Sequence, residues 1–204
     1  MKKKGFTLAE ALVALAVVGV VAAMTVPQIA IGVQKKQAGA MLAKAYAQIE
    51  QGMQNYVQAY NDTSADGSFV EKWTDIPNKD IKVLMTYSGA KFVKELNSGD
   101  FMIKTRPGSG GSIGSGGDLY RFNKLPVEFE VSQFLWSYNI MVDVNGIENK
   151  PNTYGVDVFR FKLDPNGGFE PEGKEDWKEK CGDTISDGKA CTARVMAEGW
   201  KITY

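Results

Sequence analysis

The chain has 204 residues, and its 24 lysines and arginines balance 24 aspartates and glutamates, so the formal net charge is zero. This length fits one domain plus an anchoring segment, and the charge balance lacks the basic excess that favours nucleic-acid binding. The sequence contains no histidine, which removes the commonest general acid–base group and the commonest transition-metal ligand. Most hydrolase sites are therefore excluded, and we predict that the protein is not an enzyme.

The N-terminal segment combines a basic start with a long apolar run. Three lysines at 2–4 precede the stretch 11–33, which contains no charged residue and is long enough for the roughly 20 residues that cross a bilayer. Lysines on one side predict a cytoplasmic N-terminus and a translocated remainder. Glu10 is unexpected here, because a carboxylate in an apolar span costs about 2.5–3.5 kcal/mol near the bilayer centre and less near its end.

The stretch Gly5-Phe6-Thr7-Leu8-Ala9-Glu10 resembles the cleavage and methylation motif of type IV prepilins and of type II secretion pseudopilins. The resemblance implies that a prepilin peptidase removes the leader, residues 1–5, and methylates the new amino terminus at Phe6. It also implies that Glu10 pairs with the terminal amine of a neighbouring subunit. Such a pair would form only when subunits stack in register, so Glu10 would direct assembly.

Two more positions agree with this resemblance, because Gly19 and Pro27 fall where the family carries residues that loosen the helix. An ordinary secretory signal and an uncleaved signal anchor are the alternatives. The small-x-small stretch 14–16 lies inside the apolar run rather than after it, which disfavours the first alternative. An anchor alone does not explain Glu10 beside the Gly-Phe junction.

An amphipathic helix is predicted beyond Pro27. No turn cluster separates it from the apolar run, so we expect one helix over about 6–60, roughly 80 Å long, in which Pro27 removes one backbone donor. Residues 6–34 would form its transmembrane and filament-core half, residues 35–60 its amphipathic half, and the turn-forming residues 61–68 its end. Apolar residues recur at steps of three and four, namely Ala38, Met41, Leu42, Ala45, Ile49, Met53, Val57 and Tyr60.

The remainder, 61–204, is predicted to be a globular domain on the far side of the membrane. Asp80 is expected to cap a helix whose apolar positions extend to Leu96. The glycine-rich stretch 107–117 lacks both the Gly-Lys-Ser/Thr ending and the GxGxxG spacing of phosphate-binding loops, so we predict a flexible surface loop.

Alternating apolar and polar residues predict two strands, Phe134–Val142 and Val156–Leu163, joined by turn-rich residues and followed by a second turn at 164–168. A short helix over 191–198 would end at Gly199. The predicted fold class is therefore α+β and pilin-like: the long helix packs on a small antiparallel sheet, with a C-terminal disulfide loop. Segments in this half, among them 142–146 and 199–204, also resemble prepilin-type proteins of type II secretion.

The two cysteines, Cys181 and Cys191, form no CxxC motif. In a translocated domain such an isolated pair predicts a disulfide, whereas two free thiols would be expected if the protein never left the cytoplasm.

Oxygen-bearing side chains gather in the turn-rich stretch between the predicted strands. Some pseudopilins bind calcium in C-terminal loops, so the resemblance makes Asp143, Asn145 and Asp157 weak calcium candidates. Their spacing does not follow the EF-hand formula, and capping of turns by Asp143 and Asn145 is the alternative explanation. No other cofactor is expected.

Two functions remain. The first is a structural subunit of a type IV pilus or a type II secretion pseudopilus, with prepilin peptidase, other pilin or pseudopilin subunits, an inner-membrane assembly platform and membrane lipid as partners. It would be a single-pass protein of the bacterial inner membrane with a periplasmic domain, and later part of a filament. The second is a membrane-anchored periplasmic binding protein or enzyme with an uncleaved signal anchor.

Overall fold

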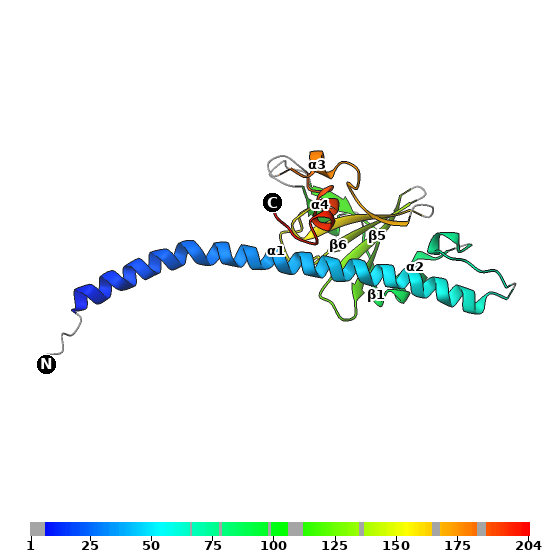
Figure 1. The fold of residues 1–204 in the computed structure, drawn as a ribbon, viewed down its shortest axis with the longest axis horizontal. Helices are drawn as coiled ribbons and strands as arrows, with labels where there is room; N and C mark the ends of the chain where they lie inside the picture. Colours follow the sequence, from blue (N-terminus) through cyan, green and yellow to red (C-terminus); the bar gives the residue numbers. More distant parts are fainter. Residues whose placement is uncertain are drawn as a thin grey trace. The chain divides into compact units, whose positions relative to one another are not determined.

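The computed structural model describes residues 7–65, 67–77, 79–97, 99–105, 112–134, 137–164, 168–182 and 187–204. It divides into two compact units, Met1–Gln37 and Ala38–Tyr204. One helix, α1 (Leu8–Thr63), belongs to both units (Figure 1). The predicted single helix, running from the apolar segment into the amphipathic one without a break, is confirmed.

In the first unit, α1 is an apolar helix without a protein core around it. Its large side chains are exposed, Leu15 to 69% and Ile29 to 65%. Among the described residues, α1 is the helix long and apolar enough to cross a membrane, judged by length and composition. Pro27 lies inside it and, having no N–H, leaves the carbonyl of Ala23 without its usual helical donor.

In the second unit, one stripe of α1 faces the core. Its buried residues are Gly39, Leu42, Ala45, Ile49 and Gly52, which recur at steps of three and four and so lie along one side of the helix. The predicted apolar residues Ala38, Met41, Met53 and Val57 flank this stripe and pack against the same core cluster.

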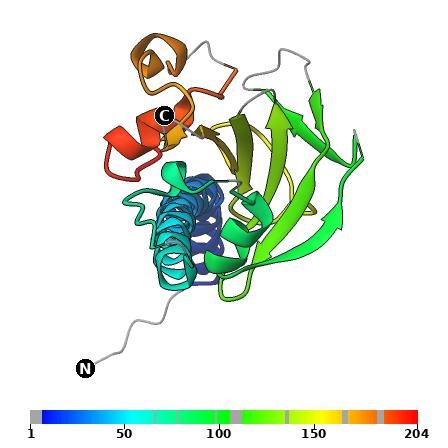
Figure 2. The same ribbon diagram turned by 90° about the vertical axis from the view of Figure 1, so that its right-hand side faces the viewer.

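A six-stranded antiparallel sheet forms the other main layer of the second unit, with strand order β1-β4-β5-β6-β7-β8. Figure 2 shows these strands beside the cyan part of α1. A separate two-stranded sheet pairs β2 with β3. The strands are β1 (Ala90–Glu95), β2 (Phe101–Lys104), β3 (Ser112–Ser115), β4 (Asp118–Phe122), β5 (Glu128–Phe134), β6 (Ser137–Asp143), β7 (Val158–Asp164) and β8 (Gly168–Pro171).

Both faces of the six-stranded sheet are covered. Ile140 and Val142 of β6 belong to the cluster that contains the buried α1 residues. Met141, between them, belongs to a second cluster with Phe101 and Ile103 of β2. Because successive side chains of a strand point to opposite faces, α1 packs on one face and β2 on the other. The predicted α+β arrangement, a long helix on a small antiparallel sheet, is therefore confirmed.

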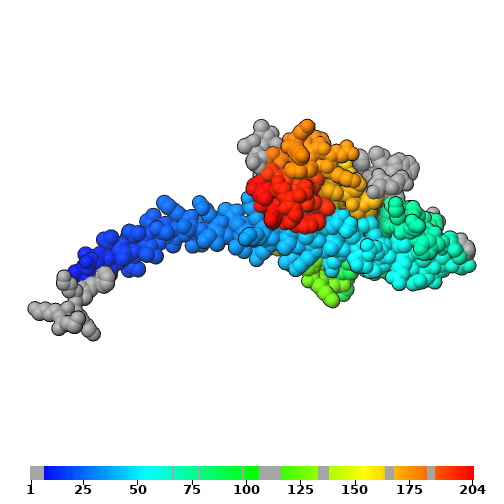
Figure 3. Space-filling view, viewed as in Figure 1, coloured from blue at the N-terminus to red at the C-terminus, as the bar shows by residue number. Residues whose placement is uncertain are grey.

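Two helical glycines allow α1 to approach other backbone closely. A Cβ added at Gly39 would lie 2.1 Å from the carbonyl oxygen of Trp200, and one at Gly52 would lie 2.6–2.7 Å from atoms of Ser88. Figure 3 shows the C-terminal segment, in red, against α1. Glycine at these positions therefore lets the C-terminal tail and the turn after α2 (Ile81–Tyr87) seat directly on the helix.

The predicted helix after Asp80 is correct at its start and wrong at its end. Asp80 is the N-cap of α2, and its carboxylate accepts a hydrogen bond from Lys82 N at 2.8 Å. The helix stops at Tyr87, and Gly89 follows with φ of 76°. The next residues form β1, because their backbone pairs with β4, and this long-range pairing overrides the local helical spacing.

The glycine-rich segment also departs from the prediction. Ser112–Ser115 forms β3, paired with β2 residue by residue from Phe101↔Ser115 to Lys104↔Ser112, so the expected loop is wrong for these residues. Residues 107–111 lie outside the described part of the chain. The sequence did not predict this strand, because its glycine and serine residues do not give the alternation of apolar and polar side chains that is typical of a strand.

The two predicted strands are confirmed with shifted ends. The first, β6, starts at Ser137 rather than Phe134, and Trp136 lies outside the described residues. The second, β7, starts at Val158, because residues 155–157 form a turn.

The C-terminal predictions hold. Cys181 and Cys191 form a disulfide between the short helix α3 (Trp177–Lys180) and the start of α4 (Cys191–Ala197). The helix α4 is followed by Gly199 with φ of 69°.

Candidate functional site

The first turn of α1 is closed by a reciprocal pair of side chains. The backbone N and the Oγ1 of Thr7 donate to Glu10 Oε2 at 2.8 and 2.9 Å, and Glu10 N donates to Thr7 Oγ1 at 3.3 Å. This is a capping box, in which a threonine before the helix and a glutamate three residues later satisfy backbone donors at the helix start. The Thr-x-x-Glu spacing was visible in the sequence, and it supplies Glu10 with a partner within its own chain.

Of the other predicted residues of this segment, the two that the structure describes, Gly19 and Pro27, do not cluster with Glu10. Gly5 and Phe6, the predicted cleavage and methylation positions, lie outside the described residues. Gly19 has open space around it, since an added Cβ would meet nothing within 4 Å. Glu10, Gly19 and Pro27 are spread along the helix, about 12–14 Å apart in successive steps at 1.5 Å per residue. Their arrangement suits contact with other helices or lipid rather than chemistry at one point.

A second group of polar residues occupies the connection between β6 and β7. Asp157 organises its C-terminal half: Oδ1 accepts from Thr153 N at 2.6 Å, and Oδ2 accepts from Asn152 N at 2.9 Å. Asp157 also joins the two ends of the connection, because its backbone oxygen accepts from Val144 N at 2.9 Å. Burial raises the pKa of the Asp157 carboxyl, although these hydrogen bonds favour its charged form.

Asp143, the last residue of β6, is fully buried at the other end of this connection. Its Oδ1 accepts from Asn145 N at 3.0 Å, which is the predicted turn-capping bond. Burial raises the pKa of Asp143 to about 7, against backbone hydrogen bonds from Asn145 and Gly146 that lower it. A buried carboxylate of this kind is costly unless a partner compensates its charge.

The structure brings the three calcium candidates together. Asn145 contacts both acids, since its N donates to Asp143 and its Nδ2 lies 3.4 Å from Asp157 Oδ2. Across the described ranges, no three Asp, Glu, Cys or His side chains form a metal-binding group. The donor set is therefore two carboxylates with neighbouring amides. One of these amides, Asn152, was not predicted from the sequence. It lies in a turn-rich connection, and nothing in the sequence indicates that its side chain is only 2% exposed.

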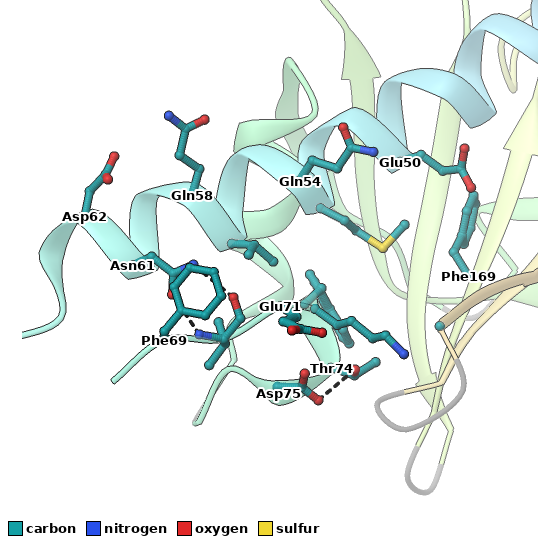
Figure 4. Close-up of a pocket in the computed structure, with 16 residues that line it drawn as sticks. Glu50, Gln54, Gln58, Asn61, Asp62, Phe69, Glu71, Thr74, Asp75 and Phe169 are labelled. Atoms are coloured by element: carbon teal, nitrogen blue, oxygen red, sulfur yellow. Dashed lines mark hydrogen bonds between the residues drawn. The ribbon is translucent and has the colours of Figure 1, made fainter. Parts of the chain in front are cut away.

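The second unit also contains an open groove of about 1100 Å³ between the last turns of α1, the segment 69–75 and β8 (Figure 4). Asn61 fastens one wall, exchanging hydrogen bonds of 2.9 Å in both directions with the backbone of Val70. Phe69 is 76% exposed. The described lining holds carboxylates, amides and one lysine but neither cysteine nor histidine, so a nucleophile paired with a histidine base is not available there.

Comparison with known proteins adds one finding. Residues 1–26 match the family model described as the prokaryotic N-terminal methylation motif. The chain carries the N-terminal methylation motif. This motif is the signature of type IV pilins and pseudopilins, which are structural subunits rather than enzymes. The match covers the segment that contains Thr7, Glu10 and Gly19, and the predicted resemblance is thereby confirmed.

No curated protein and no solved structure matches the chain. The fold is nevertheless α+β and pilin-like. It combines the long apolar helix, which carries the methylation motif at its start, with the antiparallel sheet and the disulfide near the C-terminus.

Proposed function

We propose that the protein is a prepilin or pseudopilin, a structural subunit of a type IV pilus or a type II secretion pseudopilus. In this proposal it is cleaved after Gly5, methylated on Phe6 and assembled through the N-terminal part of α1. The observation that carries the proposal is the methylation motif at the head of an exposed apolar helix. Such a helix needs a partner for its apolar surface, and lipid and the same helix of other subunits both provide one.

The proposal gives Glu10 two successive partners. In the single chain its Oε2 completes the capping box with Thr7. In a filament the carboxylate would face the terminal amine of a neighbouring subunit, where a buried charge is tolerated only when it is paired. Because cleavage after Gly5 leaves one residue before Thr7, the processed amine and the capping box belong to the same short segment.

The remaining parts of the proposal follow from this topology. The three N-terminal lysines would keep the leader in the cytoplasm, where prepilin peptidase and an assembly platform of the inner membrane would act on it. The second unit would lie in the periplasm, where a disulfide such as Cys181–Cys191 persists.

The mature N-terminus tests the proposal. Intact-mass and N-terminal peptide analysis of the chain from cells that contain a prepilin peptidase should show loss of residues 1–5 and one methyl group on the Phe6 amine. The matched sample comes from cells without the peptidase and should keep residues 1–5. A chain that remains uncut in both cells, or one cut near Met24, would contradict the assignment.

A membrane-anchored binding protein is the second candidate, favoured by the groove between α1 and the segment 69–75. This candidate needs no cleavage after Gly5 and no methylation, so the same mass measurement separates the two.

A further inference from the structure

The open groove of the second unit is acidic. Its lining includes Glu50 and Asp62 from α1 and Glu71 and Asp75 from the chain segment that faces α1 (Figure 4). Among the described residues, none of these four carboxylates forms an ion pair, and the described lining holds a single lysine, Lys72. The groove therefore carries a negative charge that the chain itself does not compensate, and it attracts a cationic partner.

Apolar side chains lie among these acids. Met53 and Val57, four residues apart and so on one side of α1, line the groove together with Phe69 and Phe169. Phe69 is 76% exposed. An exposed apolar surface with a polar rim marks an interaction site. The chemistry of the groove therefore suits a partner that presents apolar and basic side chains side by side.

The strand β1 presents this combination on the same unit. Phe92 and Val93 are 54% and 41% exposed, and they lie between Lys91 and Lys94, which form no ion pair within the described ranges. Glu95, which follows, is the acid of this strand, just as the groove has its single lysine. The two surfaces are thus complementary in charge, and each has exposed apolar side chains.

The outer side of β1 is available for a contact. This strand ends the strand order of the six-stranded sheet, so in the described part of the chain no strand pairs with its outer side. Its lysines and the bulge between Phe92 and Lys94 are features that discourage pairing with a further strand. The edge is therefore better suited to placing side chains in a groove than to extending a sheet.

The two complementary surfaces lie at opposite edges of the sheet. The groove includes Gly168 and Phe169 of β8, and β1 is the strand at the other end. Five spacings of about 4.8 Å separate the outermost of six strands, which is about 24 Å. A chain therefore cannot place its own β1 in its own groove. A contact between two different surfaces is heterologous, and it repeats from copy to copy into an open filament unless its rotation closes a ring.

We propose that the groove of one copy of this chain binds the β1 edge of the next. Lys91 and Lys94 face the groove carboxylates, and Phe92 and Val93 pack against its apolar side chains. This inference rests on the proposed function as a filament subunit, and it gives the second unit a contact of its own in addition to those of α1. Because the charges on both surfaces are exposed, the contact weakens as the salt concentration rises.

Cross-linking between full-length chains in detergent tests this contact. The two native cysteines are joined in a disulfide, so an added cysteine is the reactive thiol. Gln58→Cys places it on the groove wall, and Val93→Cys places it on β1. Oxidation of the two variants mixed together should give a linked dimer, whereas either variant alone should give little. A chain that carries both substitutions should give a ladder of multimers, because a heterologous contact does not close on two copies.

The matched control for the groove position is Gln51→Cys, which is also an exposed residue of α1 but does not line the groove. Mixed with Val93→Cys, it should give only the small amount of dimer that either variant gives alone. A cross-link that forms equally well with Gln51→Cys would overturn the proposal.

Charge exchange tests the complementarity. Lys91→Glu combined with Lys94→Glu in the Val93→Cys chain should lower cross-linking at least about tenfold, because like charges then face one another. Glu71→Lys combined with Asp75→Lys in the groove chain should restore it. All four positions are exposed, so folding should be unaffected, and near-ultraviolet circular dichroism checks this. Failure of the exchanged pair to recover the cross-link would contradict the proposed pairing.

The remaining outcomes are also decisive. Efficient dimers of Gln58→Cys alone would mean that two grooves meet in a closed twofold contact, and absence of every cross-link would leave the groove to a different partner. Both results overturn the proposal. The mature N-terminus tests the filament function separately. A processed chain without the cross-link would remove this contact and keep that function, whereas an uncut chain would remove the function whatever the cross-link shows.

Discussion

Glu10 has two separable properties, a capping oxygen and a negative charge. In the structure its Oε2 accepts both hydrogen bonds from Thr7. Glutamine can make the same reciprocal bonds but cannot form an ion pair with a terminal amine. Replacing the residue by glutamine or by alanine therefore distinguishes the cap from the charge.

We predict that Glu10→Gln and Glu10→Ala both insert into the membrane and are processed, and that both enter filaments poorly, because a neutral side chain leaves the buried amine unpaired. Quantitative blotting of sheared filament fractions against whole cells measures incorporation. Thr7→Ala is the control for the cap, since it removes the threonine hydroxyl at a cost of about 1 kcal/mol of helix stability and keeps the charge. Normal incorporation of Glu10→Gln would show that the charge is dispensable.

Gly52 belongs to the residue scale as well, because its hydrogen side chain sets the distance between α1 and the turn after α2. An added methyl group would lie 2.6–2.7 Å from the Cβ, Cα and N of Ser88, and two of these are backbone atoms that cannot rotate away. Alanine favours a helix over glycine by about 1 kcal/mol, but this clash acts in the opposite direction.

We predict that Gly52→Ala lowers the free energy of unfolding of the second unit by about 1–3 kcal/mol, the usual cost of overpacking. Urea unfolding followed by tryptophan fluorescence gives this value. Gly32→Ala is the matched control: it also lies inside α1, an added Cβ meets nothing within 4 Å, and no destabilisation is expected. Equal stability of the two variants would contradict the close approach at Ser88.

At the scale of elements, the disulfide ties α3 to α4 beside the C-terminal tail. Arg194 of α4 donates to the carbonyl oxygen of Cys181 at 2.8 Å and lies over the ring of Tyr204 at 4.8 Å. Tyr204 in turn donates to the carbonyl oxygen of Gly155 at 2.9 Å. The disulfide region is thus connected to the turn before β7 and is not an isolated loop.

We predict that Cys181→Ser combined with Cys191→Ser lowers the free energy of unfolding by about 2.5–3 kcal/mol, from the chain entropy of so short a closed loop. Urea unfolding with and without a reducing agent provides the measurement. The reductant should shift the midpoint of the wild type and leave that of the double variant in place. A shift of the double variant as well would mean that the reductant acts on something other than this bond.

Sequence periodicity predicted some helices and strands correctly and missed others. Capping residues located the start of α2 and the end of α4, and periodicity located the amphipathic part of α1 and the strands β6 and β7, which each bury a face with its own repeat. Periodicity failed between 88 and 115, where β1 and β3 form through pairing with distant strands. In β1 only Ala90 is buried, so the strand carries no alternation that could reveal it.

At the scale of the whole molecule, the exposed apolar part of α1 is the property that governs location. Its side chains between Leu8 and Val33 have no protein cover in the single chain. Water is a poor solvent for a surface of this size, and the helix fits a single membrane anchor.

We predict that the full chain stays in the membrane fraction after alkaline carbonate extraction. Val20→Asp, which places a charge in the middle of the span at a cost of about 3 kcal/mol, should reduce the inserted fraction. Immunoblotting of pellet and supernatant measures both. Ala22→Leu serves as the control, because it adds apolar surface to the same span and should remain fully inserted. Release of the wild-type chain by carbonate would contradict a membrane span.

The sequence alone determined the anchor, the methylation motif, the disulfide and the α+β class, because each depends on local features: an uncharged run, a short motif, two cysteines and repeating apolar spacing. Only the tertiary structure decided which glycines touch other backbone, where β1 and β3 pair, and which side chains in the connection between β6 and β7 are buried. These properties depend on contacts between residues far apart in the chain. Asn152 illustrates the difference: its sequence context predicts a turn, and only folding buries its side chain and brings its backbone N to Asp157 Oδ2.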